Sequence, residues 1–540
     1  MLRRVTATLL ALVLLCTIPA AAAEGSSYSD VPPGDWSVSA IEKAREYGLM
    51  DGIGNGNFGY GQQMNRASFV KVLCNMFGWA EVKPAAPSYT DMQGHWSYGW
   101  VEAALQHGAL EPGGAFRPDQ SITREEMAVM LVRSLDYDQL AASMQNAALP
   151  FDDVTTNRGY IALAYRFGII NGGTQNGKTY FFPTQASNRE VAAAMLVRAY
   201  ERHTAKIDWL HGFYAFGSYE RIDLTARMDA VSVGWARLAV HPERDIFLNQ
   251  TTEQNNEWVV PAGADLAVNT FSANGTPYNL NVFSEGEALA AILESESSRA
   301  QGAAAIAAAV EPYNGITIDF EGLREDKKDS FTAFMSALRA ALPAEKALWV
   351  AVQTPDWYKG FDYRALGDIC DKVILMAHDY KVRDIPAVGS TKTDNPVTPF
   401  PKVYQALSAI TDSETGVQDR SKIALAIAID SSGCQINESG AVTVAARYSP
   451  GAATLTERLR QPDAARGWSD IYRNAYVTYT DADGKIYRVW YEDARGVMEK
   501  VRLASMFDIH GISLWRVGNI PTASDPGLEY DVWSALLTRR

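Results

Sequence analysis

The segment YNGITIDFEGL, residues 313–323, places two carboxylates two positions apart at the end of an apolar run. Apolar and polar residues alternate through it, which is the period of a β-strand, so Asp319 and Glu321 should share one face. Two carboxylates at this spacing repel each other when both are ionised, so the pKa of one should rise, as a general acid near neutral pH requires. Glu321, nearer the strand end, is the expected acid.

This segment resembles the fourth-strand signature of glycoside hydrolase family 18, written DGxDxDxE and carried on a (β/α)8 barrel. Gly315, Asp319 and Glu321 match it, whereas Asn314 and Thr317 replace its first two aspartates. The resemblance implies that Glu321 protonates the glycosidic oxygen while Asp319 orients the substrate's N-acetyl group, whose carbonyl oxygen attacks the anomeric carbon. This substrate-assisted reaction uses no protein nucleophile, and we expect neither a cofactor nor a metal. The replaced aspartates belong to the family's charge relay beneath Asp319.

From Ile207 onward, candidate strands alternate with longer helical stretches, the pattern of a parallel α/β barrel. We expect helices within 285–310 and 328–341, and active-site groups at the carboxyl ends of the strands. The turn at Asp483-Gly484 predicts a hairpin inside an α+β insertion at about 434–500. The expected strands are 212–218, 229–235, 266–271, 315–320, 348–353, 371–378, 423–429 and 511–517.

Two further strand ends resemble family 18. The sequence MAHDY matches the family's MxYD at Met376 and Asp379, with His378 in place of a tyrosine that hydrogen-bonds the acetamide oxygen. An imidazole N–H can donate in the same way, although a histidine satisfied by its neighbouring aspartate is the alternative. GISLWRVGN matches the eighth strand, where Trp515 would stack under the sugar, and Trp490 of the insertion could line the same cleft. Core packing is the alternative for both tryptophans.

The run VWYEDARGVMEKVRLASMFDIHGISLWRVG resembles the family 18 branch that includes spore cortex-lytic N-acetylglucosaminidases. That closer resemblance shifts the expected substrate from chitin towards peptidoglycan.

An internal repeat precedes the barrel. Asp30, Asp91 and Asp153 open its three copies at intervals of about 61 and 62 residues. Each copy predicts a helix that ends at a glycine-containing turn, then a Phe-bearing loop and a second helix. In the second copy, Thr123 and Glu126 have the spacing of a helix capping box.

This threefold pattern resembles S-layer homology domains, which hold pyruvylated secondary polymers of the bacterial wall. A guanidinium suits a ketal carboxylate and an aromatic face suits a sugar, although the arginines could instead only pair with nearby acids. The third copy has NRGY where the others carry tryptophan, so we expect Arg189 to matter least. The residues at the family's ligand-contacting positions are Trp36, Arg66, Trp96, Arg124 and Arg189. The copies are expected at 28–84, 88–145 and 149–204.

Charge and composition exclude some partners. Lys plus Arg is 49 against 63 Asp plus Glu, and the net charge of −14 argues against nucleic acid and against simple adsorption to acidic surfaces. Residues 1–23 read as a secretory signal, and no later stretch is apolar for long enough to span a membrane. Three cysteines follow the predicted signal: Cys74, Cys370 and Cys434. They resemble small buried hydrophobic residues, with a Cys370–Cys434 disulfide as the less favoured alternative.

The sequence therefore predicts an α/β protein: a (β/α)8 TIM barrel at 207–540 with an α+β insertion, preceded by a mainly helical three-repeat unit. The expected function is a secreted, wall-anchored glycosidase that cleaves β-linked N-acetylglucosamine in peptidoglycan or a chitin-like polymer. Secondary cell-wall polysaccharide is the expected partner of the repeats. The alternative is a non-catalytic glycan-binding or structural surface protein, and the presence of both Asp319 and Glu321 favours the enzyme.

Overall fold

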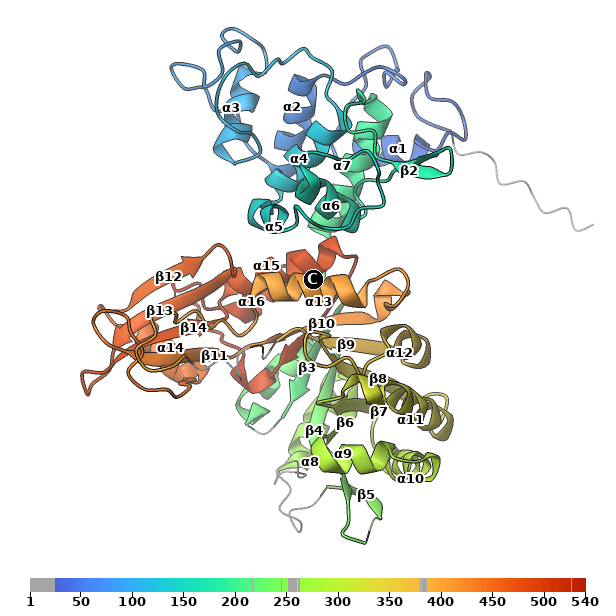
Figure 1. Ribbon diagram of the computed structural model, residues 1–540, viewed down its shortest axis with the longest axis vertical. Helices are drawn as coiled ribbons and strands as arrows, with labels where there is room; N and C mark the ends of the chain where they lie inside the picture. Colours follow the sequence, from blue (N-terminus) through green and yellow to red (C-terminus); the bar gives the residue numbers. More distant parts are fainter. Residues whose placement is uncertain are drawn as a thin grey trace, which may run out of the picture. The chain divides into compact units, whose positions relative to one another are not determined.

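The structure, a computed structural model, describes residues 25–215, 217–243, 245–250, 260, 263–378, 380, 386–525 and 527–540. The signal predicted at 1–23 and the candidate residue Asp379 lie outside the described residues. The chain packs as two compact units (Figure 1). One comprises residues up to Met127 together with Pro183–Val197, and the other comprises Ala128–Phe182 with Arg198–Arg540.

The repeats are mainly helical, as predicted. A short antiparallel pair, β1 and β2, lies in the loop of the third repeat. The elements are α1 (Val38–Glu46), α2 (Arg66–Phe77), α3 (Tyr98–Gln106), α4 (Arg124–Ser134), α5 (Asp138–Ser143), α6 (Arg158–Arg166), β1 (Gly173–Gln175), β2 (Lys178–Tyr180) and α7 (Arg189–Thr204).

The aspartate that opens each repeat clamps the Phe-bearing loop of the same repeat. The two carboxylate oxygens of Asp30 accept the backbone N–H groups of residues 58–60 at 2.7–2.9 Å. Asp91 and Asp153 each accept two N–H groups in the same way. The conformation of the loop therefore depends on the aspartate, which gives a physical reason for its recurrence in all three copies.

The three segments that precede α2, α4 and α7 hydrogen-bond to one another in a ring. The Met64 N–H donates to the Ser187 carbonyl, Ser187 to Ile122, and Ile122 to Met64, each at 2.9 Å. At the start of α4, Thr123 and Glu126 exchange side-chain to backbone hydrogen bonds at 2.9 and 3.2 Å, so the predicted capping box is confirmed.

Eight parallel strands form a closed barrel in the second unit, as predicted. Their order is β3-β15-β10-β9-β8-β7-β6-β4, and the β3–β4 pairing closes the ring. β5 (Ile246–Asn249) extends β4 in the antiparallel sense. The barrel strands are β3 (Trp209–Tyr214), β4 (Ala230–Val240), β6 (Tyr278–Ser284), β7 (Gly315–Phe320), β8 (Ala347–Gln353), β9 (Lys372–Met376), β10 (Ile423–Ala428) and β15 (Gly511–Trp515).

One predicted strand is wrong. Residues 266–271 belong to helix α8 (Ala264–Asn274), and β6, which follows it, is the third barrel strand. The apparent alternation is misleading because Ala267 and Phe271, four positions apart, are the buried residues, whereas Leu266 is 50% exposed. That spacing is helical.

Helices cover the outside of the barrel, and Figure 1 shows α9 to α12 side by side along it. The predicted helix at 285–310 is divided into α9 and α10, while the one at 328–341 is confirmed as α11. Besides α8, the helices are α9 (Gly286–Leu293), α10 (Glu296–Ala307), α11 (Lys328–Ala341), α12 (Tyr363–Ile369), α13 (Phe400–Ile410), α15 (Ala494–Met506) and α16 (Val532–Leu537). The short 3-10 turns are η1 (Ser218–Arg227), η3 (Glu325–Lys327), η4 (Arg420–Lys422) and η5 (Val517–Asn519).

Between β10 and β15 the chain forms a separate antiparallel sheet of order β11-β14-β13-β12. β13 and β14 pair through the turn at Gly484, which has a positive φ of 78°, so the predicted hairpin is confirmed. The elements of this insertion are β11 (Ser431–Ile436), α14 (Ala452–Leu459), β12 (Ala465–Ser469), β13 (Asn474–Thr480) and β14 (Ile486–Tyr491).

A fully buried ion pair connects this sheet to the barrel helix α15. Lys500 Nζ lies 2.8 Å from a carboxylate oxygen of Glu492, and it also donates to the backbone carbonyls of Arg473 and Gly496. The other oxygen of Glu492 accepts from Asn474 at 2.6 Å. Because every partner is hydrogen-bonded, removing one member would leave a buried unpaired charge, which costs several kcal/mol, roughly 3–5.

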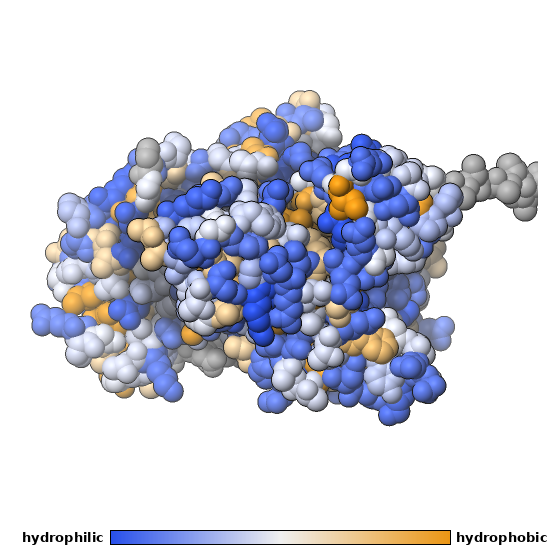
Figure 2. Space-filling view, turned by 90° about the horizontal axis from the view of Figure 1, so that it is seen from above, coloured by the Kyte–Doolittle hydropathy of each residue, from blue (hydrophilic) through white to orange (hydrophobic). Residues whose placement is uncertain are grey.

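The surface in Figure 2 is hydrophilic over most of the face shown, with apolar residues in small separate groups. Among the residues described, no helix combines the length and the apolarity needed to cross a bilayer. Cys74, Cys370 and Cys434 are buried free thiols, so the alternative Cys370–Cys434 disulfide is not formed.

The clamp in the first repeat leads to a stability prediction. Burial alone would raise the pKa of Asp30, but the N–H groups of its loop outweigh burial and lower the pKa from 3.8. Asp30→Asn replaces an acceptor with a donor, so it should lower the free energy of unfolding by about 1–2 kcal/mol at pH 7. A group with a lowered folded pKa stabilises above its unfolded pKa, so this difference should vanish as the pH falls through the folded pKa.

Urea unfolding of the full chain at pH 7 and pH 3 measures this difference. Asp51→Asn is the control, because that side chain is exposed in the same repeat. Equal effects of the two substitutions would contradict the role of the clamp.

Candidate functional site

Strand β7 presents opposite faces to the barrel interior and to the helices. The Thr317 hydroxyl lies 2.7 Å from the Ser232 hydroxyl of β4 inside the barrel, whereas the Phe320 ring packs against Phe334 of α11 at 5.2 Å. The predicted alternation is therefore confirmed. Asp319, two residues after Thr317, lies on the inner face.

Asp319 is almost completely buried, with 3% exposure. Its Oδ2 accepts one hydrogen bond, from Asn281 of β6 at 3.2 Å, and its Oδ1 has no hydrogen-bond partner among the described residues. Burial raises the pKa of Asp319 to about 6, while Asn281 and the positive potential of His378, two residues beyond β9, act in the opposite direction. Carboxylate repulsion is the cause expected from the sequence, but burial is the main cause in the structure.

Glu321 follows β7 directly and is half-buried. Its backbone N–H donates to the Ser284 carbonyl at 3.0 Å, which extends the pairing of β7 with β6. Gln353, at the end of β8, donates from Nε2 to the Glu321 carboxylate at 3.2 Å. The side-chain oxygen Oε1 of Gln353 accepts the Gly322 N–H at 2.7 Å. This amide therefore orients both the Glu321 carboxylate and the backbone that follows it.

A chain of neutral hydrogen bonds crosses the barrel beneath Asp319. It runs from Ser513 through His211 and Ser232 to Thr317, with successive distances of 2.8, 2.9 and 2.7 Å. Complete burial lowers the pKa of His211 to about 3, so the imidazole is neutral at physiological pH. Where the family signature carries an aspartate, Thr317 thus belongs to an uncharged network.

Met376 and Trp515 meet at the barrel end, where β9 and β15 finish. Both pack in one apolar cluster with Phe213 of β3, and the rings of Phe213 and Trp515 lie 5.4 Å apart. Trp515 also lines a cavity of about 320 Å³ with Asp430 and Arg516, beyond the ends of β10 and β15. The structure therefore brings these two candidate residues together.

Trp490 does not belong to this group. It lies on β14, it is 3% exposed, and its indole N–H donates to the Thr393 carbonyl at 2.9 Å. Its ring packs against Tyr476 at 4.9 Å. The structure therefore supports the alternative of core packing for Trp490, because its ring packs within the insertion and its indole N–H is paired with Thr393, which precedes the insertion.

The arginines of the repeats join one repeat to the next. Arg66 Nε donates to the Phe116 carbonyl at 2.8 Å and its guanidinium pairs with Glu126. Arg189 Nε donates to the Phe58 carbonyl at 2.8 Å. Each arginine thus reaches the Phe-bearing loop of another repeat, and Arg66 also makes the ion pair foreseen by the alternative interpretation.

This exchange between repeats changes the neighbours expected for the arginines, while their ranking in wall binding stays a prediction. Arg189 lies against the loop of the first repeat, which carries Trp36, and not against its own tryptophan-free repeat. Arg124 donates its backbone N–H to Gln185, in the loop region of the third repeat. Arg124 therefore contacts a segment of the third repeat through its backbone. The two tryptophans are exposed, Trp36 by 60% and Trp96 by 53%.

Sequence reasoning missed the residues that surround the two carboxylates. Asn281, Gln353 and His211 come from three other strands, and which of them faces Asp319 or Glu321 depends on the register between strands. A polar residue inside an apolar strand, such as Asn281 in NLNVF, is the signal that could have identified them.

The burial of Asp319 leads to a prediction about stability. Its folded pKa of about 6 lies above the ordinary value of 3.8, so its contribution favours folding at low pH and is lost as the pH rises through about 6. Asp319→Asn removes the buried charge, so it should stabilise the chain at pH 7.5 by up to about 3 kcal/mol and have little effect at pH 4.

Thermal unfolding at the two pH values tests this prediction. Asp326→Asn, at an exposed aspartate nearby, serves as the control and should change little at either pH. The same stabilisation at pH 4 and pH 7.5 would contradict a cause in the buried charge.

Comparison with known proteins matches two parts of the chain to known families. The family model of glycosyl hydrolases family 18 matches residues 282–519, and that of the S-layer homology domain matches residues 27–70 and 88–128. The cortical fragment-lytic enzyme of Bacillus subtilis (strain 168) is 27% identical over 214 residues, which are 38% of this chain and 47% of that protein. This chain thus spans about half the length of that relative.

Two further proteins resemble separate parts of the chain. The S-layer protein sap of Bacillus anthracis is 28% identical over 135 residues, which are 25% of this chain and 17% of that protein. A crystal structure of a C-terminal domain from Desulfitobacterium hafniense DCB-2 has a TM-score of 0.50 and 20% identity, and covers 62% of this chain and 99% of that domain. The latter likeness shows a common fold. The chain therefore combines a glycosyl hydrolase family 18 domain with S-layer homology domains.

Proposed function

We propose that this protein is a glycosidase that cleaves β-linked N-acetylglucosamine in a cell-wall glycan, with Glu321 as the general acid. The observation that carries the proposal is the pair of carboxylates at the end of β7. Asp319 is buried with an oxygen that has no hydrogen-bond partner among the described residues, and Glu321 is half-buried and oriented by Gln353. A structural carboxylate would satisfy both its oxygens, so this arrangement favours a ligand.

Each group has a defined part in the reaction. Glu321 gives its proton to the glycosidic oxygen as the bond to the anomeric carbon breaks. The acetamide carbonyl oxygen of the substrate forms the new bond to that carbon, and Asp319 accepts the acetamide N–H through its available oxygen. Water then attacks the anomeric carbon of the resulting oxazolinium ion, Glu321 accepts a proton from that water, and the bond from the carbon to the acetamide oxygen breaks. Two inversions at the same carbon retain the configuration.

The remaining candidates support the sugar. His378 would donate to the acetamide oxygen, and its effect on the pKa of Asp319 is consistent with a position close to that carboxylate. Trp515, held against Phe213, would stack under the ring, with Met376 packed in the same cluster. Asp379, outside the described residues, remains a candidate on sequence grounds alone.

Peptidoglycan is the favoured substrate over a chitin-like polymer. The cortical fragment-lytic enzyme matches 38% of this chain, and its name describes the lysis of cortical fragments. The S-layer homology domains favour a location on the cell surface, where peptidoglycan is present. In this proposal the N-terminal segment directs export, and the repeats hold the enzyme at the wall through secondary polysaccharide.

The wall polymer would meet the exposed tryptophan faces of the repeats whose loops are braced by arginines. Trp36 belongs to the repeat whose loop Arg189 contacts, and Trp96 to the repeat whose loop Arg66 contacts. An aromatic face next to a guanidinium suits a sugar that carries a carboxylate. The third repeat lacks the tryptophan and would contribute least.

A carboxamide at position 321 tests the acid. Glu321→Gln keeps the shape and a hydrogen bond with Gln353 but has no proton to give, so turnover should fall by about a hundredfold to ten-thousandfold while glycan binding remains. Release of reducing ends from purified peptidoglycan measures turnover. Glu325→Gln is the matched control, since Glu325 is exposed four residues later. An unchanged rate in Glu321→Gln would exclude the assignment.

Removing the N-acetyl group from the substrate tests the nucleophile. The parent should fail on a de-N-acetylated glycan whatever its affinity, because the internal nucleophile is missing. Equal cleavage of acetylated and de-acetylated chains would rule out substrate assistance. If the parent binds acetylated oligomers and releases no reducing ends, the protein is a glycan-binding protein, and the uncharged network at Thr317 gives the reason.

Wall attachment is tested at the exposed tryptophans. The double variant Trp36→Ala/Trp96→Ala should lose most of its sedimentation with isolated walls, with little loss of stability because both side chains are exposed. Ile471→Ala, at a residue 58% exposed in the insertion, is the control. Binding that survives both the double variant and removal of the secondary polymer from the walls would refute this mode of attachment.

A further inference from the structure

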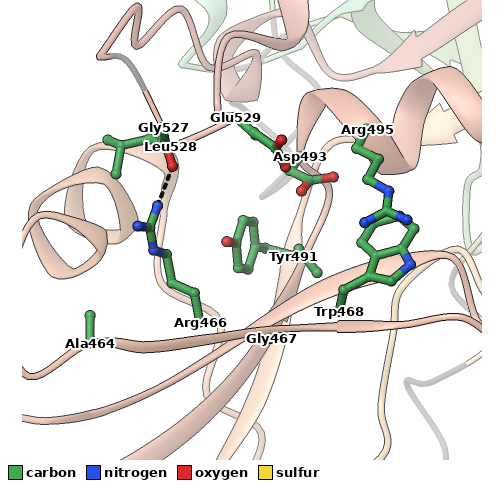
Figure 3. Close-up of a pocket in the computed structure, with 11 residues that line it drawn as sticks. Ala464, Arg466, Gly467, Trp468, Tyr491, Asp493, Arg495, Gly527, Leu528 and Glu529 are labelled. Atoms are coloured by element: carbon green, nitrogen blue, oxygen red, sulfur yellow. Dashed lines mark hydrogen bonds between the residues drawn. The ribbon is translucent and has the colours of Figure 1, made fainter. Parts of the chain in front are cut away.

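A pocket of about 540 Å³ opens on the insertion, between β12, the start of α15 and residues 527–529 (Figure 3). Arg466 and Arg495 lie on opposite sides of it, and the carboxylates of Asp493 and Glu529 lie between them (Figure 3). The residues assigned above to glycan cleavage do not line this pocket. Both signs of charge therefore face one cavity outside the catalytic site.

The two arginines have donors to offer. Arg466 donates one N–H to the Gly527 carbonyl, and the guanidinium of Arg495 lies 3.8 Å from the ring centre of Trp468, which fixes its plane. Both side chains are exposed. A guanidinium has five N–H donors in a fork that matches a carboxylate, so either arginine can bind a ligand carboxylate in bidentate fashion.

The two acids supply the opposite charge. Asp493 accepts the Gly496 N–H at 2.6 Å with Oδ1, which leaves Oδ2 for a ligand, and Glu529 is exposed at the mouth. Burial raises the pKa of Asp493 to about 6, so its carboxylate is ionised in most molecules at neutral pH. An ammonium group fits beside these oxygens.

The aromatic residues of the pocket are not placed to stack on a sugar. Tyr491 belongs to the apolar core of the insertion, where its ring packs against Tyr530 at 5.5 Å. One face of Trp468 is covered by Arg495, and its ring also packs against the core of the insertion. Recognition here therefore depends on charge, and the matching ligand carries an ammonium and a carboxylate.

The pocket lies next to the cavity that contains Trp515. Tyr491 and Asp493 line the pocket, whereas Glu492, between them, lines the cavity beside Trp515. Neighbouring residues of an extended chain point to opposite sides, so one strand's thickness separates the two spaces. A glycan in the cavity could therefore place a side branch across this wall.

We propose that the pocket binds the zwitterionic end of peptide branches on the glycan that occupies the barrel. The inference rests on the proposed function and deepens it. Peptidoglycan carries amino-acid branches with free amines and carboxylates, and a chitin-like polymer does not, so the pocket selects peptidoglycan.

Calorimetric binding in the Glu321→Gln background tests the inference without turnover. The probes are a soluble glycan oligomer whose peptides end in a free amine and carboxylate, the same oligomer stripped of peptide, and the peptide alone. Arg466→Gln and Arg495→Gln should each raise Kd for the peptide-bearing oligomer about tenfold and leave Kd for the stripped oligomer within about twofold. Lys485→Gln, which removes one cation from the hairpin of the same sheet, is the control and should leave both unchanged.

Equal affinity of the unsubstituted pocket for both oligomers would overturn the inference, as would variants that weaken both alike. The peptide alone should compete weakly, and only in proteins with both arginines. Circular dichroism checks the fold, and Glu529→Gln, at an exposed acid, tests the pocket independently if an arginine variant unfolds. A protein that prefers the peptide-bearing oligomer yet, with Glu321 intact, cleaves neither would refute the proposed function and leave the pocket standing.

Discussion

The closed ring of hydrogen bonds among eight parallel strands is the constraint on which the second unit depends. β15 pairs with β3 and β3 pairs with β4, so the sheet returns to its own first strand. Since the strands run in one direction, their carboxyl ends meet at one rim. Asp319 and Trp515, almost two hundred residues apart in sequence, reach that rim only because the ring is closed.

The barrel interior also sets the chemistry of Asp319. A carboxylate removed from water is costly unless several donors surround it, and the protein supplies Asn281 and the potential of His378. The network below, from Ser513 to Thr317, is neutral, so it adds no negative charge that would raise the pKa further. Among the described residues, Oδ1 of Asp319 has no donor, and in the proposed function the acetamide N–H of the substrate provides one. A buried acceptor without a donor lowers the stability of the fold, and in the proposed function the same acceptor binds the substrate.

Local patterns in the sequence were sufficient where the structure depends on neighbouring residues. The alternation in β7, the helix α11 and the capping box at Thr123 are of this kind. Local patterns failed where packing between distant segments decides the secondary structure. Residues 266–271 have the alternation of a strand, but their buried residues recur at helical spacing. For the same reason, the hydrogen-bond partners of Glu321 and Asp319 can be predicted only when the register between strands is known. The partners of Arg189 can be predicted only when the contacts between repeats are known.

The buried Lys500–Glu492 pair explains how the insertion can form a wall of fixed position. Lys500 belongs to a barrel helix, and Glu492 follows the last strand of the inserted sheet, so the pair connects the two at 2.8 Å. Such a pair gains little free energy over apolar packing, but it penalises any shift that separates the charges. Fixing Glu492 also fixes its neighbours Tyr491 and Asp493 on the opposite side. The cavity beside Trp515 and the charged pocket thus keep one geometry relative to each other, as two sites for one branched polymer would require.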